Sequence, residues 1–414
     1  MEMVTVSEAE KIISAHLMSY GEEVICLEDA VGRVLAEDLV ADRDLPPFNR
    51  ATVDGIAIQT ASVKNNNSLY AVCGIQAAGV APLKVFSENH CIEIMTGAAV
   101  DPIFDAVIRY EDCVIEDGSA RLLPDLEVKP GMNIHYRGKD KQQGEILAEK
   151  NRVLTPALIG LAASTGQARL RVKKLPRIVV ISTGDEMVPL TEVPTAYQLR
   201  RSNGIVVKSC LAKYKIHPQL MHLNDELEQV RTALTECLQQ YDVLIITGGV
   251  SMGKFDFIPQ VLSELGVQKQ FHKVRQRPGK PFWFGSFKDA RQQASELRHP
   301  VSKLIFALPG NPVSVFMCLN RYFLPWLQAS LGLSEPGYEY AVLNSDILFK
   351  PALQYFAQVK LKVNNTGVVE ATPLTTNGSG DFSNLMYADA FMELPGDRAD
   401  GRFKKGECFK VWRF

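Results

Sequence analysis

The sequence has no long apolar run, no excess of positive charge and no cysteines at metal-binding spacing. Its longest apolar stretches, such as "VLIITGGV", fall far short of the roughly 20 residues that a membrane-spanning helix needs. The net charge is −2, and no long run of lysine and arginine occurs. A basic surface is the usual electrostatic mark of nucleic-acid binding. We therefore expect neither a membrane nor a nucleic acid as a partner.

The eight cysteines are scattered from Cys26 to Cys408, and none forms a C-x-x-C pair or a zinc motif with histidine. Scattered, unpaired thiols are typical of a reducing compartment. The first residues, "MEMVTVSEAEKIIS", lack the basic and apolar regions of a signal peptide. These features predict a cytoplasmic protein.

The composition is that of an ordinary globular protein, with 46% apolar and 22% charged residues. A chain of 414 residues is too long for one hydrophobic core, so about three or four domains are expected.

Three patterns of predicted secondary structure follow one another along the chain. After "LPPFNR" come short β-like segments such as "GIAIQ" and "HCIEIMTG", separated by glycine, proline and asparagine. From Pro176, buried strands alternate with amphipathic helices, which predicts a parallel sheet covered on both faces. After about Pro336 only strands remain, and these predict a small β-barrel or sandwich.

Three strands of the predicted sheet end in unusual loops: "STGDE", "TGGVSMGKFD" and "LPGNPVS". Ligands of open parallel sheets bind beyond the carboxyl ends of the strands. The glycines let the backbone approach an anion closely, and a following helix N-terminus favours phosphate. Each loop alone could be only a tight turn, with Asp256 or Asn311 as a helix cap. Three such loops in one sheet favour a binding site.

The segment "KVRQRPGKPF", Lys273 to Phe282, carries four cations. Alternate side chains of an extended backbone share a face, so Lys273, Arg275 and Arg277 could line one side. A solvated edge strand is the alternative. Carboxylates repel phosphate, so carboxylates beside anion-binding loops suggest a bridging Mg²⁺. The residues alone thus indicate a phosphorylated or nucleotide-like ligand, Mg²⁺, and chemistry on a phosphoanhydride or another oxyanion.

Seven motifs in family order make the chain resemble the molybdopterin molybdenumtransferase family, which includes MoeA and the gephyrin E domain. They are "LPPFNRATVDGIA", "IMTGAAV", "GMNIHYRGKD", "STGDE", "TGGVSMGKFD", "RPGKPFWFG" and "LPGNPVS". The resemblance runs nearly end to end.

The resemblance implies insertion of molybdenum into the dithiolene of molybdopterin. The substrates would be molybdate and adenylylated molybdopterin, and Mg²⁺-dependent cleavage would release AMP. An adenylyltransferase would act upstream, and molybdenum apo-enzymes would receive the product. The family is a homodimer with its site between one subunit's sheet domain and the other's N-terminal region.

The resemblance also implies an α/β multidomain fold. Its central three-layer α/β/α sheet domain, of the MogA-like type, would span residues 176–332. A β-rich inserted domain would span 49–135, and a C-terminal β-barrel domain 333–414. Residues 1–48 and 136–175 would together form an N-terminal linking and dimerisation domain.

Functional residues carry over where the motifs match. The expected catalytic residues are Asp54, Thr96, Asp140, Glu186, Asp225 and Asp256. The expected substrate-binding residues are Thr183, Gly184, Asp185, Gly248, Gly249, Ser251, Lys273, Arg277, Lys280, Pro309, Asn311, Pro312 and Ser314. Glu186 and Asp256 are the expected metal ligands. The chain departs from the family pattern at Arg50, Arg201, Gln358 and Asp389.

Two other functions fit parts of the pattern. An adenylyltransferase that makes the adenylylated pterin from ATP would need only the sheet domain and its loops. A non-enzymatic scaffold of the gephyrin type would use the same fold to cluster a partner. The motifs outside the sheet domain favour the molybdenum-inserting enzyme over the first, and the complete set of carboxylates favours it over the second.

Overall fold

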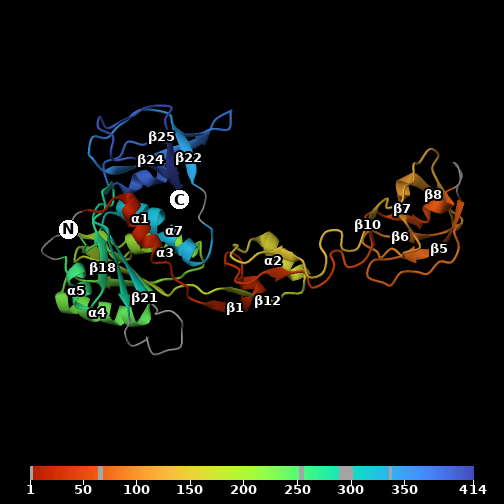
Figure 1. Cartoon of the computed structure of the whole chain (residues 1–414), viewed down its shortest axis with the longest axis horizontal. Coiled ribbons are helices and arrows are strands. Elements are labelled where there is room, and N and C mark those ends of the chain that lie inside the picture. Colours follow the sequence, from red (N-terminus) through yellow and green to blue (C-terminus); the bar gives the residue numbers. More distant parts are fainter. Residues whose placement is uncertain (1–2, 64–68, 251–255, 289–301, 335–337) are drawn as a thin grey trace.

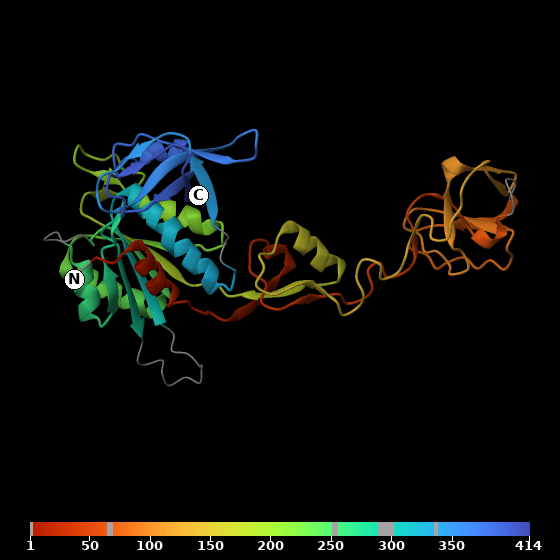
Figure 2. The same ribbon diagram turned by 45° about the horizontal axis from the view of Figure 1, so that its top comes forward.

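The computed structural model describes residues 3–63, 69–250, 256–288, 302–334 and 338–414. The molecule is elongated: the sheet domain and the C-terminal barrel lie together at one end, and a β-rich domain lies at the other (Figure 1). A slender linking region joins the two ends (Figure 2). Among the described residues, no helix is both long and apolar enough to cross a membrane.

The sheet domain is built on six strands in the order β16-β13-β17-β21-β20-β18. The first four strands are parallel, whereas β20 and β18 are antiparallel to their neighbours. The strands are β13 (Ile178–Thr183), β16 (Gln219–Leu223), β17 (Val243–Thr247), β18 (Gln268–His272), β20 (Trp283–Lys288) and β21 (Ser302–Leu308).

Helices cover both faces of this sheet because successive strand side chains point to opposite sides. Val179 and Ile181 pack against one helix layer, whereas Ile178 and Val180 pack against the other. The first layer is α4 (Leu227–Gln240) and α5 (Ile258–Glu264). The second layer is α1 (Val6–Ser14), α3 (Asn203–Ala212), α6 (Pro312–Cys318), the π-helical turn η5 (Leu319–Phe323) and α7 (Leu324–Ser330). The predicted three-layer α/β/α domain is confirmed.

Helix α1 begins the chain and joins the sheet domain rather than the linking region. A capping box of Thr5 and Glu8 starts it, and the Glu8 backbone N–H donates to Thr5 Oγ1 at 3.2 Å. Val6, Ala9 and Ile13 are buried in the same core as the sheet. The expected domain boundaries stay a prediction, but α1 packs on the sheet domain, whereas most of the apolar core residues between 22 and 40 pack in the linking region.

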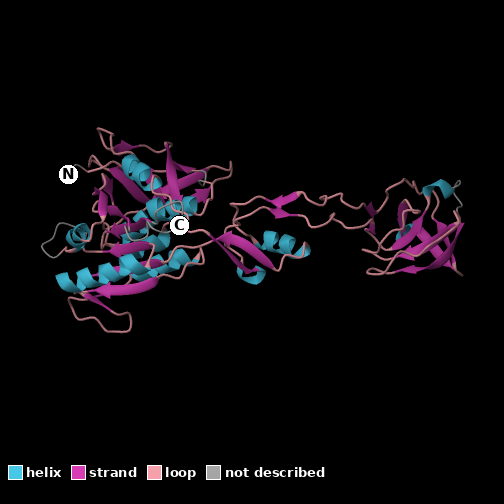
Figure 3. Ribbon diagram, turned by 60° about the horizontal axis from the view of Figure 1, so that its bottom comes forward, coloured by secondary structure: helices cyan, strands magenta, loops and turns pink. Residues whose placement is uncertain are grey.

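The linking region consists of short antiparallel pairs, a 3₁₀ turn and one α-helix, with a small core of its own, while Ala51 and Ile134 of its outermost pair join the core of the β-rich domain. Figure 3 shows the chain passing outward and back through it as two extended segments. Its elements are β1 (Glu22–Cys26) with β12 (Arg169–Lys173), β2 (Leu39–Val40) with β11 (Ile146–Ala148), β3 (Arg50–Ala51) with β10 (Ile134–His135), η1 (Leu27–Asp29) and α2 (Pro156–Ser164).

The distal domain is a six-stranded sheet in the order β7-β4-β6-β5-β9-β8, with an apolar cluster on each face. This confirms the predicted β-rich N-terminal region. Its elements are β4 (Gly55–Ile58), η2 (Thr60–Ser62), β5 (Leu69–Gln76), β6 (His90–Ile94), β7 (Ala106–Arg109), η3 (Tyr110–Asp112), β8 (Cys113–Glu116) and β9 (Ser119–Leu122).

The C-terminal domain is a closed five-stranded barrel, as predicted. Strands β24, β25, β22, β28 and β26 pair in that order, and β26 pairs back with β24. Strand β19 (Gln276–Arg277) of the basic segment adds to β24 from outside. The other elements are β22 (Glu339–Leu343), β23 (Ile347–Leu348), β24 (Gln354–Val363), β25 (Val369–Pro373), η6 (Phe382–Tyr387), β26 (Ala390–Leu394), β27 (Arg402–Phe403) and β28 (Cys408–Arg413).

Arg321 ties three parts of this end together. Its side chain is only 4% exposed, and its Nη2 lies 2.8 Å from Glu10 Oε2 of α1. Its Nε lies 3.2 Å from Glu393 Oε2 of the barrel, and its guanidinium lies over the Trp412 ring. Breaking a buried ion pair from one side leaves uncompensated charge, which costs far more than the pair itself contributes.

The change Arg321→Leu should therefore lower the free energy of unfolding by about 3–5 kcal/mol. The reason is that Glu393, which is 11% exposed, would keep its charge without its cation. Urea unfolding followed by tryptophan fluorescence measures this, because all three tryptophans (Trp283, Trp326 and Trp412) lie in the sheet domain and barrel.

The control is Arg413→Leu, which removes an exposed pair with Glu339 on the barrel surface. It should cost less than about 1 kcal/mol. Equal unfolding midpoints for the two variants would show that Arg321 does not hold the junction.

Candidate active site

Three loops meet at one edge of the parallel sheet because their strands end at the same level. Ser182 of β13 pairs with Thr247 of β17, and Thr247 pairs with Leu308 of β21. The loops "STGDE", "TGG" and "LPGNPVS" therefore start side by side. Of the residues expected here, Ser251 lies outside the described part of the chain.

Glycines allow these loops to pack directly on one another. Gly248 has a φ of +91°, and a Cβ added there would lie 2.8 Å from Thr183 Oγ1. A Cβ on Gly310 would lie 3.7 Å from the Cα of Gly248. Gly184, with a φ of +123°, leaves room for the Glu186 carboxylate, which would lie 2.4 Å from an added Cβ. A side chain at Gly248 would push the second loop away from the first, and one at Gly184 would displace the Glu186 carboxylate within its own loop.

Carboxylates from three loops gather at this edge. Asp185 Oδ1 accepts a hydrogen bond from the backbone N–H of Asp225 at 3.0 Å. Burial, and then the negative charges of Asp185, Glu186 and Asp256, raise the pKa of Asp225. The four side chains thus repel one another, which is the electrostatic state that a bound cation would relieve.

None of these carboxylates is explained as a helix cap. Phe257 stands at the N-cap of α5 and Glu226 at that of α4, and neither of these two side chains makes a capping bond. Asn311 does stand at the N-cap of α6, but its Nδ2 donates to Ser379 Oγ of the barrel at 2.8 Å. The capping alternative for Asp256 therefore loses its support.

Carboxylate oxygens are the ligands that Mg²⁺ prefers. In the described residues, however, no three or more histidine, cysteine, aspartate or glutamate side chains are grouped to hold a metal ion. The expected ligands Glu186 and Asp256 could thus supply only part of a coordination shell. The assignment of these two residues to a metal stays a prediction.

The residue that precedes the basic segment contacts the second of these loops. His272 Nε2 is 2.9 Å from the carbonyl oxygen of Val250, in the second loop. Burial lowers the pKa of His272; the positive charge of Lys273 lowers it further, and the negative charge of Asp256 opposes this. Lys273 and Asp256 therefore act on the same ring, which brings cation and carboxylate to one site.

Alternation within the segment is as expected for an extended backbone. Val274 and Gln276 are buried, whereas Arg275 and Arg277 are exposed. Gln276 Nε2 donates to the carbonyl oxygen of Gly279 at 3.0 Å, and the Tyr322 hydroxyl donates to Gln276 Oε1. This buried anchor fixes the turn that carries Arg277 and Lys280.

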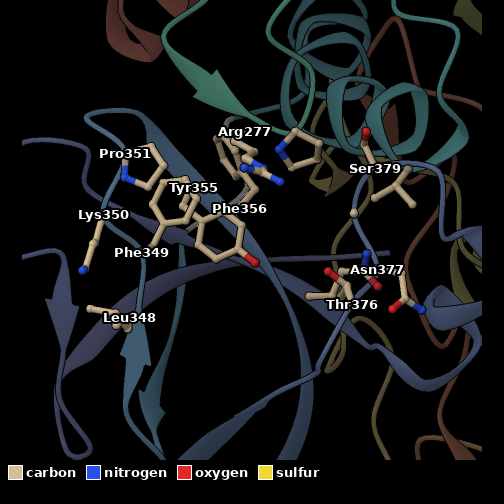
Figure 4. A pocket seen from close by; sticks show the side chains of 14 residues that line it. Arg277, Leu348, Phe349, Lys350, Pro351, Tyr355, Phe356, Thr376, Asn377 and Ser379 are labelled. Atoms are coloured by element: carbon tan, nitrogen blue, oxygen red, sulfur yellow. The ribbon is translucent and has the colours of Figure 1, made fainter.

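Arg277 faces a pocket of about 480 Å³ between the basic segment and the barrel (Figure 4). Tyr355 lies near it, and burial raises the pKa of this tyrosine while the charge of Arg277 opposes the rise. Thr376, Asn377 and Ser379 line the other side. Gln358, one of the departures from the family pattern, also lines it.

The loop "LPGNPVS" connects the sheet edge to this pocket. Pro309 and Ser314 are buried, and the Val313 backbone N–H donates to the carbonyl oxygen of Ser379 at 3.3 Å. Pro312 occupies the first turn of α6. Sequence reasoning missed the barrel loop 376–379; its glycine-rich "TTNGSG" was the available signal.

Two further residues flank the carboxylates: Arg201, one of the departures from the family pattern, and His222, which sequence reasoning missed. Arg201 Nε donates to the carbonyl oxygen of Met187 at 3.1 Å, within the small parallel pair β14 (Met187–Val188) and β15 (Leu199–Arg200). Burial, and then the charge of Arg201, lower the pKa of His222, whereas the charge of Glu186 opposes them. No family motif drew attention to His222.

The three remaining expected residues lie away from the sheet edge. Asp54 Oδ1 accepts hydrogen bonds from the Thr96 N–H at 2.6 Å and the Thr96 hydroxyl at 2.7 Å. These bonds lower the pKa of Asp54. Asp140 Oδ1 lies 2.9 Å from His135 Nε2. Asp54 and Thr96 belong to the distal domain, which Figures 1 and 2 place far from the sheet within one chain.

Family comparisons cover nearly the whole chain. The MoeA N-terminal region (domains I and II) matches residues 4–166, and a probable molybdopterin binding domain matches residues 179–329. The MoeA C-terminal region (domain IV) matches residues 340–414.

Similar proteins span the same length. A molybdopterin molybdenumtransferase of Synechocystis sp. is 37% identical over 99% of this chain and 100% of its own. One of Bacillus subtilis is 31% identical over 95% and 90% of the two chains. A crystal structure of a molybdopterin biosynthesis MoeA protein from Pyrococcus horikoshii superposes with a TM-score of 0.80 at 26% identity, covering 100% of each chain.

The domain matches, the extent of identity and the shared architecture agree, and the chain belongs to the molybdopterin molybdenumtransferase family.

Proposed function

We propose that this enzyme of molybdenum cofactor biosynthesis transfers molybdenum from molybdate to the dithiolene of adenylylated molybdopterin and releases AMP. The proposal extends the family membership to a substrate pair and a product. The proposal rests on one observation: three kinds of group meet at a single sheet edge. These are glycine loops whose backbone an anion can approach, four carboxylates and a basic segment. We place the reaction in the cytoplasm.

Each group at the edge has a separate task. The loops around Thr183, Gly248 and Gly249 allow the backbone to approach the pyrophosphate of the substrate. Lys273, Arg277 and Lys280 balance the charge of phosphate and molybdate oxygens. Asp225, whose pKa is raised by burial and its neighbours, is suited to take a proton from water.

Glu186 and Asp256 would hold a Mg²⁺ ion, with the substrate's phosphate oxygens completing its shell. When bound, the ion would supply charge neutralisation at the phosphoanhydride. The mutual repulsion of the carboxylates supports a cation at this edge. The residues themselves position the substrate and the attacking water.

We further propose a homodimer in which the linking region and distal domain of one subunit, together called the arm, reach the sheet edge of the other. Asp54 and Thr96 belong to the distal domain and Asp140 to the linking region, so a second copy is the route by which we expect them to join the site. An adenylyltransferase would use the sheet edge without this arm, and a scaffold would need no carboxylate cluster.

The change Asp256→Asn should abolish molybdate-dependent AMP formation, with a loss of at least about a hundredfold. The amide keeps the shape of the side chain but cannot supply a negative oxygen to a cation. AMP is measured by chromatography after adding adenylylated molybdopterin, molybdate and Mg²⁺ to the purified protein.

Asp117→Asn is the matched control, because Asp117 lies in an exposed hairpin at a φ of +47° that asparagine also adopts. It should retain wild-type rates. Equal rates for both variants would count against the enzyme assignment, and pyrophosphate release from ATP would favour an adenylyltransferase instead.

The change Asp225→Asn should stabilise the purified protein slightly at neutral pH, although it removes activity. A raised folded-state pKa means that the ionised carboxylate costs stability above that pKa, and asparagine avoids this cost. The gain should stay under about 1 kcal/mol, because much of the group is reached by water.

The gain should shrink as the pH falls through the raised folded-state pKa and vanish below the unfolded value of about 3.9, where Asp225 is protonated in both states. Thermal unfolding at pH 7 and pH 3.5 tests the sign. A variant less stable than the wild type at pH 7 would contradict mutual repulsion of the carboxylates.

Mixing two inactive variants should restore activity if the site is shared between subunits. Asp54→Asn damages the arm and Asp256→Asn damages the sheet edge. A mixed dimer has one site in which the arm and the sheet edge both carry the wild-type aspartate. Random exchange should thus recover about a quarter of wild-type AMP formation, because half the dimers are mixed and each has one good site. A mixture that stays inactive after proven exchange would exclude the shared site.

A further inference from the structure

The turn that carries Asp140 is fixed by its backbone but leaves the carboxylate exposed. The Asp140 N–H donates to the carbonyl oxygen of Leu45 at 2.9 Å, and the Gly138 N–H donates to that of Pro46 at 3.0 Å. The Asp140 side chain is 56% exposed. A fixed Cα still leaves a carboxyl group free to turn about its side-chain bonds. Something further must aim this group.

His135 is the group that contacts this carboxylate. Its Nε2 lies 2.9 Å from Asp140 Oδ1, and its side chain is only 22% exposed. Strands β3 and β10 place Arg50 directly opposite His135. Arg50 Nη2 lies 3.3 Å from His135 Nδ1. The ring is therefore held from both sides.

The contact with Arg50 decides which ring nitrogen carries the proton. A guanidinium only donates hydrogen bonds, so His135 Nδ1 must accept. In a neutral imidazole the other nitrogen is then protonated, and Nε2–H donates to Asp140. A proton on Nδ1 would instead point at the cation. All donors run in one direction, from Arg50 through His135 to Asp140.

The other carboxylate of the arm is held in a comparable way. Asp54 Oδ1 accepts two hydrogen bonds from Thr96, at 2.6 and 2.7 Å. Thr96 and His135 both lie within family motifs, but only Thr96 was among the expected site residues. Both carboxylates of the arm thus have a donor that restricts their rotation.

We propose that His135 is a positioning residue for Asp140, and that Arg50 fixes its Nε2–H tautomer. This inference rests on the proposed function, in which Asp140 joins the partner's sheet edge and touches the substrate. The role of His135 is to deliver a pre-aimed carboxylate, so its loss should affect the rate of reaction more than substrate binding.

Three variants test the role of His135 in the full-length protein. His135→Phe keeps a planar ring but loses both hydrogen bonds, and should lower kcat for AMP formation about tenfold to a hundredfold. Its KM for adenylylated molybdopterin should change less than about twofold. His135→Gln can accept from Arg50 and donate to Asp140, and should recover most of the rate. His90→Phe, in the distal sheet, is the control and should behave as the wild type.

The tautomer is tested without any activity. Selective ¹⁵N labelling of the seven histidines, with His135→Gln to assign the signal, should show His135 as neutral Nε2–H at pH 7.5. Arg50→Met should let the signal shift toward a mixture of tautomers. A protonated ring, or a proton on Nδ1, in the wild type would overturn the proposal.

Failure of this inference can be told apart from failure of the proposed function. Wild-type activity together with an unaffected His135→Phe variant, or a glutamine variant no faster than phenylalanine, would overturn the role of His135 alone. A wild-type protein that forms no AMP would overturn the function, and the tautomer measurement would still decide the hydrogen-bond chain.

Discussion

Parallel pairing of β13, β17 and β21 is the constraint on which the site depends. It ends three strands at one level, so loops that are far apart in sequence start side by side. Close approach of these loops then requires glycine, because a Cβ at Gly248 or Gly184 would run into Thr183 or Glu186. Glycines at the strand ends let the backbones of the loops pack on one another. The charged residues that follow the glycines then lie at the outer edge of the sheet.

That arrangement concentrates negative charge at a cost in stability. Burial and three neighbouring carboxylates raise the pKa of Asp225, so the edge carries electrostatic strain when nothing is bound. The basic segment lies close enough for Lys273 and Asp256 to act on the same histidine. A ligand that carries both phosphate and a divalent cation would satisfy both sets of charges. Structural stability at this end comes from elsewhere, from packed helices on both faces and from Arg321 at the junction with the barrel.

Strand and helix patterns were enough to predict the layered sheet domain and the two strand-only regions, because helices and strands differ in hydrophobic period. The pattern left a barrel and a sandwich open for the last region, and the family resemblance implied the barrel. The loops were also visible, since glycine clusters and charges stand out at strand ends. Contacts between distant segments could not be predicted from the sequence. The pairing of β19 with β24, the bond from Asn311 to Ser379 and the packing of α1 on the sheet join residues whose local sequence gives no sign of a partner. Tertiary packing decides them.

The carboxylates of the arm are oriented differently from those at the sheet edge. Residues at the sheet edge follow directly on the strands beneath them. Asp54 lies just before β4 of the distal sheet and Asp140 lies in a turn of the linking region, and a local donor contacts each carboxylate. Thr96 contacts Asp54 with a backbone N–H and a hydroxyl. At Asp140 the donor is a ring whose own orientation depends on Arg50 across two short strands. In the proposed composite site each half has to be rigid before the halves meet, and these hydrogen bonds restrict the rotation of both carboxylates.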